Sequence, residues 1–201
     1  MKNHEYKGVI VPIVTPFTPE EKVDVNSLKN LISYLIDGGV HGIWAAGTSG
    51  EFSALTDSER LKVIETVVEE VNGRIPIIGN ISATSTKLAI KLAKECSSIG
   101  IDALAVTPPY YYDSSQSELI DHFVQIKNET CLPLWVYNIP QTVKTAVAPM
   151  TIATLASEGA VVGVKDSSGT GELLAELNVL CEQGNIQLLR FLGTLYRTTS
   201  S

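Results

Sequence analysis

Short apolar runs alternate with longer amphipathic segments along this chain. Seven of the runs are rich in β-branched residues and are apolar at consecutive positions rather than at every second position. Such runs are typical of parallel strands buried on both faces. They are residues 9–15, 42–46, 75–79, 103–107, 134–137, 161–165 and 186–192. We expect each of them to form a strand.

Helical patterns fill the segments between these runs. The clearest signals are two capping boxes, Thr56 with Glu59 and Ser115 with Glu118, each placed before an apolar face with helical spacing. Residues 28–36 carry the same spacing and are followed by a pair of glycines that should end the helix. Further helices are predicted near residues 88–96, 150–157 and 173–180.

The regular spacing of these units predicts the fold class. The predicted strands end 27 to 33 residues apart, which indicates either a barrel of β/α units or a doubly wound sheet. Seven units in one rhythm, and no G-x-G-x-x-G after the first strand, favour a (β/α)8 TIM barrel. A complete barrel has eight units and typically ~250 residues. We therefore expect residues 1–201 to be a single barrel domain of about seven strands that lacks its last unit or units, with no eighth strand after Gly193.

Composition and charge narrow the function classes. Of the 201 residues, 44% are hydrophobic and 18% are charged, as in globular proteins. The formal net charge of −7 and the lack of a basic cluster argue against binding to nucleic acids or anionic membranes. The three cysteines are widely spaced and no apolar signal segment or membrane span is evident, which predicts a cytoplasmic protein. The scattered histidines predict no metal site.

Lys165 stands at the end of the sixth predicted strand, where a barrel carries its active site. A lysine at the mouth of an apolar strand is partly desolvated. Desolvation disfavours the ammonium form and leaves a neutral amine that can attack a ketone. The alternative is a structural lysine whose head group reaches back to solvent.

Tyr137 ends the fifth predicted strand and is therefore expected to lie beside Lys165 at the same end of the barrel. A phenol in that place can pass protons during addition to a carbonyl group and during carbon–carbon cleavage. The alternative is a core tyrosine whose hydroxyl is hydrogen-bonded.

Two loops at other strand ends carry further candidates. In Gly47–Thr48–Ser49, after the second strand, a glycine lets the backbone approach a ligand, and two hydroxyls with turn amides can hold a carboxylate. An ordinary glycine-containing turn would look the same. Three consecutive tyrosines, residues 110–112, follow the fourth strand. One could serve a proton relay and another an interface, or they could pack over the barrel mouth.

Five motifs occur in a fixed order, each at the end of a predicted strand. They are GVIVP continuing to TPF, then GTSGE, TPPYYY, YNIP and GVKDSS. In this order they closely resemble the dihydrodipicolinate synthase / N-acetylneuraminate lyase family, a group of TIM-barrel enzymes that form a Schiff base. The resemblance runs from about residue 8 to residue 193, nearly the whole chain.

The resemblance implies a role for each candidate. Lys165 would be the Schiff-base lysine and Tyr137 the proton-transferring tyrosine. Thr48 and Ser49 would bind the carboxylate of pyruvate, and Thr48 would also link the tyrosines. Tyr111 matches a tyrosine that reaches into a neighbouring subunit's site, which implies a homo-oligomer, either a tetramer or a dimer. No cofactor is expected, because the lysine imine itself serves as the electron sink.

One departure from the family pattern bears on the substrate. Synthases of the lysine pathway carry an arginine two residues after the proline of the YN-x-P motif, whereas this chain has Thr142. We therefore expect a carbon–carbon lyase of the class I aldolase type, acting on pyruvate or a related 2-oxo acid. Two alternatives remain, namely a dehydratase of 2-oxo-3-deoxy sugar acids that uses the same imine, and a truncated fragment without activity.

Overall fold

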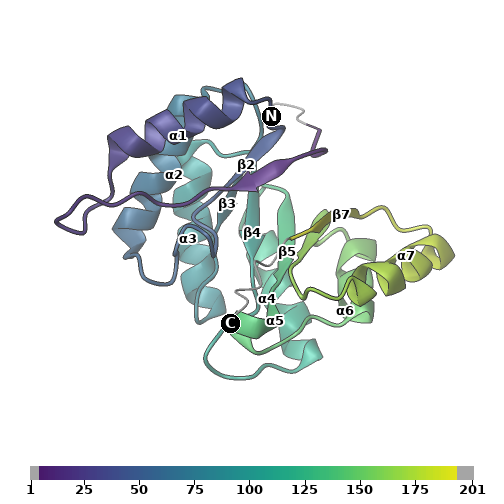
Figure 1. Cartoon of the computed structure of the whole chain (residues 1–201). Helices are drawn as coiled ribbons and strands as arrows, with labels where there is room; N and C mark the ends of the chain where they lie inside the picture. Colours follow the sequence, from purple (N-terminus) through teal and green to yellow (C-terminus); the bar gives the residue numbers. More distant parts are fainter. Residues whose placement is uncertain (1–4, 194–201) are drawn as a thin grey trace, which may run out of the picture. The chain divides into compact units, whose positions relative to one another are not determined.

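Strands and helices alternate along the whole described chain (Figure 1). The structure is a computed structural model and describes residues 5–193. The strands are β1 (Ile10–Pro12), β2 (Gly42–Ala45), β3 (Ile77–Asn80), β4 (Ala103–Val106), β5 (Leu134–Asn138), β6 (Gly163–Asp166) and β7 (Leu189–Leu192). The helices are α1 (Val25–Asp37), α2 (Asp57–Val71), α3 (Thr86–Ile99), α4 (Gln116–Asn128), α5 (Pro140–Val143), α6 (Pro149–Ser157) and α7 (Glu172–Gly184).

Each predicted apolar run overlaps one of the strands, although β3, β5 and β6 each extend one residue further, and the capping residues begin the helices as expected. Thr56 caps α2 and Ser115 caps α4, and in both cases the glutamate three residues later completes the capping box. Gly38 ends α1 through backbone hydrogen bonds to Ile36 and Tyr34. The short helix α5 was not predicted. The segment after Gly193, where no eighth strand was expected, lies outside the described residues.

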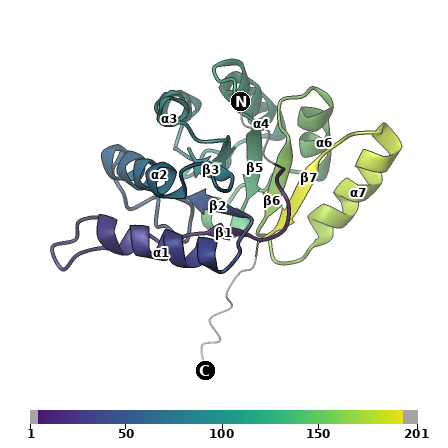
Figure 2. The ribbon, with the colours of Figure 1, turned by 90° about the horizontal axis from the view of Figure 1, so that it is seen from above.

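Contacts between the backbone segments divide the chain into two compact units. The first unit comprises residues up to Ile81 together with Lys91–Leu104. In it, β1, β2 and β3 are parallel neighbours, with Ile43 paired to Ile77 in register. Figure 2 shows α1 and α2 side by side. Their buried side chains include Leu28, Ile32, Val63, Ile64 and Val67.

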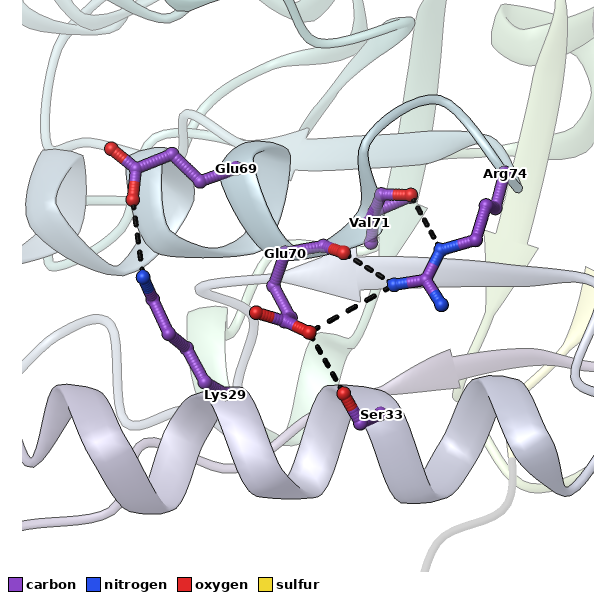
Figure 3. A network of polar contacts seen from close by, with 6 residues as sticks. All are labelled: Lys29, Ser33, Glu69, Glu70, Val71 and Arg74. Atoms are coloured by element: carbon purple, nitrogen blue, oxygen red, sulfur yellow. Dashed lines mark hydrogen bonds and ion pairs between the residues drawn. The ribbon is translucent and has the colours of Figure 1, made fainter.

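Polar contacts also join α1 to α2 in the first unit (Figure 3). Ser33 Oγ donates a 2.8 Å hydrogen bond to Glu70 Oε1, and Lys29 Nζ lies 3.4 Å from Glu69 Oε2. Arg74 donates from Nε to the carbonyl oxygen of Val71 at 3.0 Å, so that the turn after α2 is also held. The ion pair of Lys29 with Glu69 is exposed and contributes little by itself, whereas the other two contacts are partly buried.

The second unit comprises Ser82–Ile90 and the chain from Ala105 onward, and β4 is divided between the two units. In this unit β5, β6 and β7 are parallel neighbours in chain order. The register places Tyr137, Lys165 and Phe191 side by side on successive strands. Every residue of β5 is buried, whereas Leu189 and Leu192 of β7 are 40% and 65% exposed. The unit is therefore well packed around β5 and more open at β7.

Candidate active site

Lys165 and Tyr137 lie together in the second unit, as the sequence predicted. They are partners in the parallel register of β5 and β6, and their side chains leave the sheet on the same face. Lys165 Nζ lies 4.2 Å from the centroid of the Tyr137 ring. The phenol is therefore next to the amine that would react, and both stand at the carboxyl ends of their strands.

An aromatic stack lies beside Lys165 on the same face of the strands. Phe191 is the register partner of Lys165 on β7, and its ring stacks on Trp135 with centroids 5.1 Å apart and planes 19° apart. Trp135 lies across Gly163, two residues before Lys165, where an added Cβ would come within 2.6 Å of Trp135 Cε3. Glycine at position 163 therefore leaves the space into which the indole packs.

Burial in these surroundings lowers the pKa of Lys165 from 10.5 to about 8. The cause is desolvation, which penalises the ammonium and leaves the neutral amine unaffected. At pH 7 about one molecule in eleven then carries the neutral amine, compared with about one in three thousand at the ordinary pKa. A lysine of this kind is suited to attack a carbonyl carbon.

A network of buried hydrogen bonds lies one residue beyond the Tyr137–Lys165 pair. Asn138 Nδ2 donates a 2.8 Å hydrogen bond to Asp166 Oδ1, and the backbone N–H of Ser167 donates to the carbonyl oxygen of Asn138. Ser168 donates to Asp166 from both its backbone N–H and its hydroxyl, at 3.1 and 2.8 Å. The network holds the ends of β5 and β6 and the turn that follows Lys165.

Gly193 follows β7 and lies close to the side chain of Lys165. Its N–H donates a 2.6 Å hydrogen bond to the carbonyl oxygen of Asp166. A Cβ at this position would lie 3.1 Å from Lys165 Cε and would overlap Ser167 Oγ. Only a glycine lets the backbone pass this close.

The loop with Gly47, Thr48 and Ser49 follows β2 in the first unit. Gly47 is buried against Trp44, Thr48 is half-buried and Ser49 is exposed. The loop is tightly turned, because the N–H groups of Gly50 and Glu51 donate to the carbonyl oxygens of Gly47 and Thr48. It has the hydroxyls and the turn geometry that were expected of a carboxylate-binding loop, and its role stays a prediction.

The three tyrosines after β4 differ in their surroundings. Tyr110 is half-buried, whereas Tyr111 and Tyr112 are 75% and 79% exposed. The rings of Tyr111 and Tyr112 meet edge to face at 4.9 Å. Tyr111 has a φ of 91°, which is strained for a residue with a Cβ. Tyr111 is thus exposed on a strained backbone, and its expected role in a partner's site stays a prediction.

The sequence did not indicate three residues that the structure places around Lys165: Asn138, Phe191 and Gly193. Each contacts Lys165 or its neighbours through a pairing between strands that are distant in sequence. Within residues 5–193, no group of three or more His, Cys, Asp or Glu side chains could hold a metal ion. No helix of the described part is long and apolar enough to cross a membrane.

Comparison with known proteins identifies the family. The model of the dihydrodipicolinate synthetase family matches residues 5–189. The chain belongs to this family. A related protein from Thermodesulfovibrio yellowstonii, named 4-hydroxy-tetrahydrodipicolinate synthase, is 39% identical over 176 residues, covering 88% of this chain and 60% of the relative.

Solved structures of the family confirm the fold. YagE, a prophage protein of E. coli K12 solved in complex with pyruvate, superposes with a TM-score of 0.87 at 28% identity over 92% of this chain and 63% of its own. The dihydrodipicolinate synthase of Acinetobacter baumannii, also solved with pyruvate, gives 0.85 at 35% identity over 91% and 62%. The prediction of an incomplete TIM barrel is therefore confirmed. The chain spans about 60% of the length of the curated relatives it matches.

Proposed function

We propose that the chain is the larger part of a class I aldolase-type lyase in which Lys165 forms a Schiff base with pyruvate or a related 2-oxo acid. The observation that carries the proposal is the placement of a half-buried lysine whose pKa is lowered to about 8 and whose Nζ lies 4.2 Å from the centroid of the Tyr137 ring. Pyruvate is the favoured acid because two similar structures were solved with it.

The chemistry follows from an amine beside a phenol. The neutral Nζ of Lys165 attacks the keto carbon, and the resulting carbinolamine loses water after its oxygen has been protonated. The iminium that remains draws electrons from the neighbouring carbon, which loses a proton to give an enamine. Tyr137 is the group that carries these protons, and the enamine carbon then forms or breaks the carbon–carbon bond.

The remaining site residues keep the roles implied by the family. Gly47, Thr48 and Ser49 bind the carboxylate of the 2-oxo acid, and Thr48 links the tyrosines. Tyr111 serves the site of a neighbouring subunit in a homo-oligomer, a role that its exposure and strained backbone support. Residues 1–201 belong to a single barrel domain in this proposal. The cytoplasmic location and the lack of a cofactor stay predictions.

Thr142 bears on the second substrate. It is exposed on α5, and its hydroxyl donates a 3.2 Å hydrogen bond to the carbonyl oxygen of Ile139. α5 itself reaches the turn after Lys165, because Gln141 Nε2 donates to the carbonyl oxygen of Ser168 at 2.6 Å. A threonine here offers no charge for a second carboxylate, which favours a partner other than aspartate semialdehyde. The comparisons do not favour the dehydratase alternative, since the relatives are named synthases or lyases.

Exchange of the methyl protons of pyruvate in deuterated water tests the proposal. Enamine formation replaces these protons by deuterium, which proton NMR follows directly. The chain should catalyse the exchange, and the Lys165→Ala variant should not. Lys87→Ala, which removes an exposed lysine of α3, is the matched control and should exchange at the wild-type rate. Exchange that survives in Lys165→Ala would contradict the proposal.

A further inference from the structure

Asn138 and Asp166 occupy an unusual place for a polar pair. They are 1% and 0% exposed and pair in register on β5 and β6, one step beyond Tyr137 and Lys165. Because side chains alternate along a strand, they lie on the opposite face of the sheet from the amine and the phenol. In the described residues no ion pair to Asp166 is found. Buried polar groups without such compensation are costly unless hydrogen bonds satisfy them.

The side-chain hydrogen bonds of the pair join β5 to β6 and tie two further segments to them. Asp166 accepts from Asn138 and twice from Ser168, as described above. Asn138 Oδ1 accepts a 3.0 Å hydrogen bond from the backbone N–H of Val147, in the segment before α6. The orientation of the Asn138 amide is therefore determined at both ends, with its oxygen toward Val147 and its nitrogen toward Asp166.

Asp166 and Ser168 also attach two further elements near Lys165, namely α5 and β7. Ser168 carries the hydrogen bond from Gln141, so that α5 is attached to the turn that Asp166 holds. The carbonyl oxygen of Asp166 accepts from Gly193, so that β7 is attached at the same residue. The strands end here, so that these side-chain hydrogen bonds add to the few backbone hydrogen bonds that remain, from Ser167 to Asn138 and from Gly193 to Asp166.

We propose that Asn138 and Asp166 are positioning residues, a hydrogen-bonded clamp on the reverse face of the sheet that holds Lys165 against Tyr137. The inference rests on the proposed Schiff-base function. The clamp does not touch the substrate. It acts by keeping the last pair of residues of β5 and β6 together, so that Lys165 stays buried and in reach of the phenol. Small displacements of reacting groups have large kinetic effects, since about 1 Å can cost about a hundredfold.

The test compares the rate at which borohydride traps the pyruvate adduct, measured from pH 6 to 10, in the wild-type chain and in variants. Asn138→Leu replaces the asparagine by an apolar residue that neither donates nor accepts. It removes the hydrogen bond between the strands, leaves the charge of Asp166 in place and so breaks the clamp. It should slow trapping at pH 7 about ten- to hundredfold and move the midpoint of the pH profile upward, because a loosened Lys165 is better hydrated.

The double variant Asn138→Asp with Asp166→Asn exchanges the two side chains. It can restore the hydrogen bond between the strands, since the new amide donates to the new carboxylate, and it keeps an acceptor for Val147. Its midpoint should return toward the wild-type value. Thr66→Val is the matched control, because it removes the 2.8 Å hydrogen bond of a buried threonine to the carbonyl oxygen of Lys62 within α2, in the first unit. Its profile should match the wild type.

The outcomes separate this inference from the function on which it rests. A wild-type chain that forms no adduct overturns the proposed function and the clamp with it. A wild-type chain that forms the adduct, with folded Asn138→Leu giving the wild-type rate and midpoint, overturns the clamp alone. If Asn138→Leu does not fold, Ser168→Ala, which removes one hydrogen bond to Asp166, carries the test. It should shift the midpoint in the same direction by less, and an unchanged midpoint would overturn the clamp.

Discussion

Replacing Lys165 by methionine should make the protein more stable at neutral pH while abolishing the proposed chemistry. Methionine has nearly the same length and volume and no charge, so it fills the space beside Tyr137 and Phe191 without the cost of desolvation. Sites built for catalysis commonly reduce stability in this way.

The magnitude follows from the lowered pKa. A fall from 10.5 to about 8 corresponds to about 3 kcal/mol, at about 1.4 kcal/mol for each pH unit. Between pH 8 and 10.5 the unfolded chain binds a proton at Lys165 that the folded chain does not bind. The stability of the wild type therefore rises with pH across this window, and the full cost is present below pH 8.

Urea unfolding of the wild type and of Lys165→Met at pH 7 and again near pH 10.5 measures the effect. The variant should be more stable by up to about 3 kcal/mol at pH 7, and most of the gain should disappear at the higher pH. Lys87→Met, at an exposed position, controls for the general effect of removing a lysine. A variant that is no more stable at pH 7, or a gain that is the same at both pH values, would refute the assignment of a buried, desolvated amine.

Three further changes test other parts of the site. Tyr137→Phe should slow deuterium exchange into pyruvate by ~10²–10⁴-fold while the borohydride adduct still forms, and unchanged exchange would make Tyr137 a core residue only. Gly163→Ala should lower the free energy of unfolding by about 1–3 kcal/mol in urea titrations, because the new Cβ displaces Trp135. An unchanged free energy of unfolding would mean that Trp135 and Phe191 can shift without cost. Thr142→Arg should raise condensation of pyruvate with aspartate semialdehyde about ten- to hundredfold, in a coupled assay, by supplying a charge-assisted contact. An unaltered rate would show that residue 142 does not meet the second substrate.

Local sequence patterns were sufficient to predict where the strands and most of the helices lie. Continuous apolar runs identified every strand, and side-chain caps such as Thr56 and Ser115 marked where helices begin. α5 escaped prediction because Pro140–Val143 is too short to show a helical period. Leu88, in the helix predicted near residues 88–96, is 45% exposed, since periodicity does not define how wide a buried face is.

The order of the strands was sufficient to predict only one part of the candidate site, the pairing of Lys165 with Tyr137. Lys165 and Tyr137 were expected together because each lies at the end of one of two neighbouring strands. The carboxyl ends of parallel strands lie at the same end of a barrel. The hydrogen bond of Asn138 to Asp166, and the stack of Phe191 on Trp135, depend on register between segments 28 and 56 residues apart. No local pattern encodes that register, so these partners emerge only from the folded chain.

The most direct measurement of the central claim is mass spectrometry of the chain after incubation with pyruvate and sodium borohydride. The reduced adduct adds one pyruvyl group, and fragmentation of the digested protein locates it. The account predicts one adduct, on the peptide that contains Lys165, and none in Lys165→Ala treated in the same way. An unmodified wild-type chain, or an adduct of equal yield on another lysine, would contradict the account.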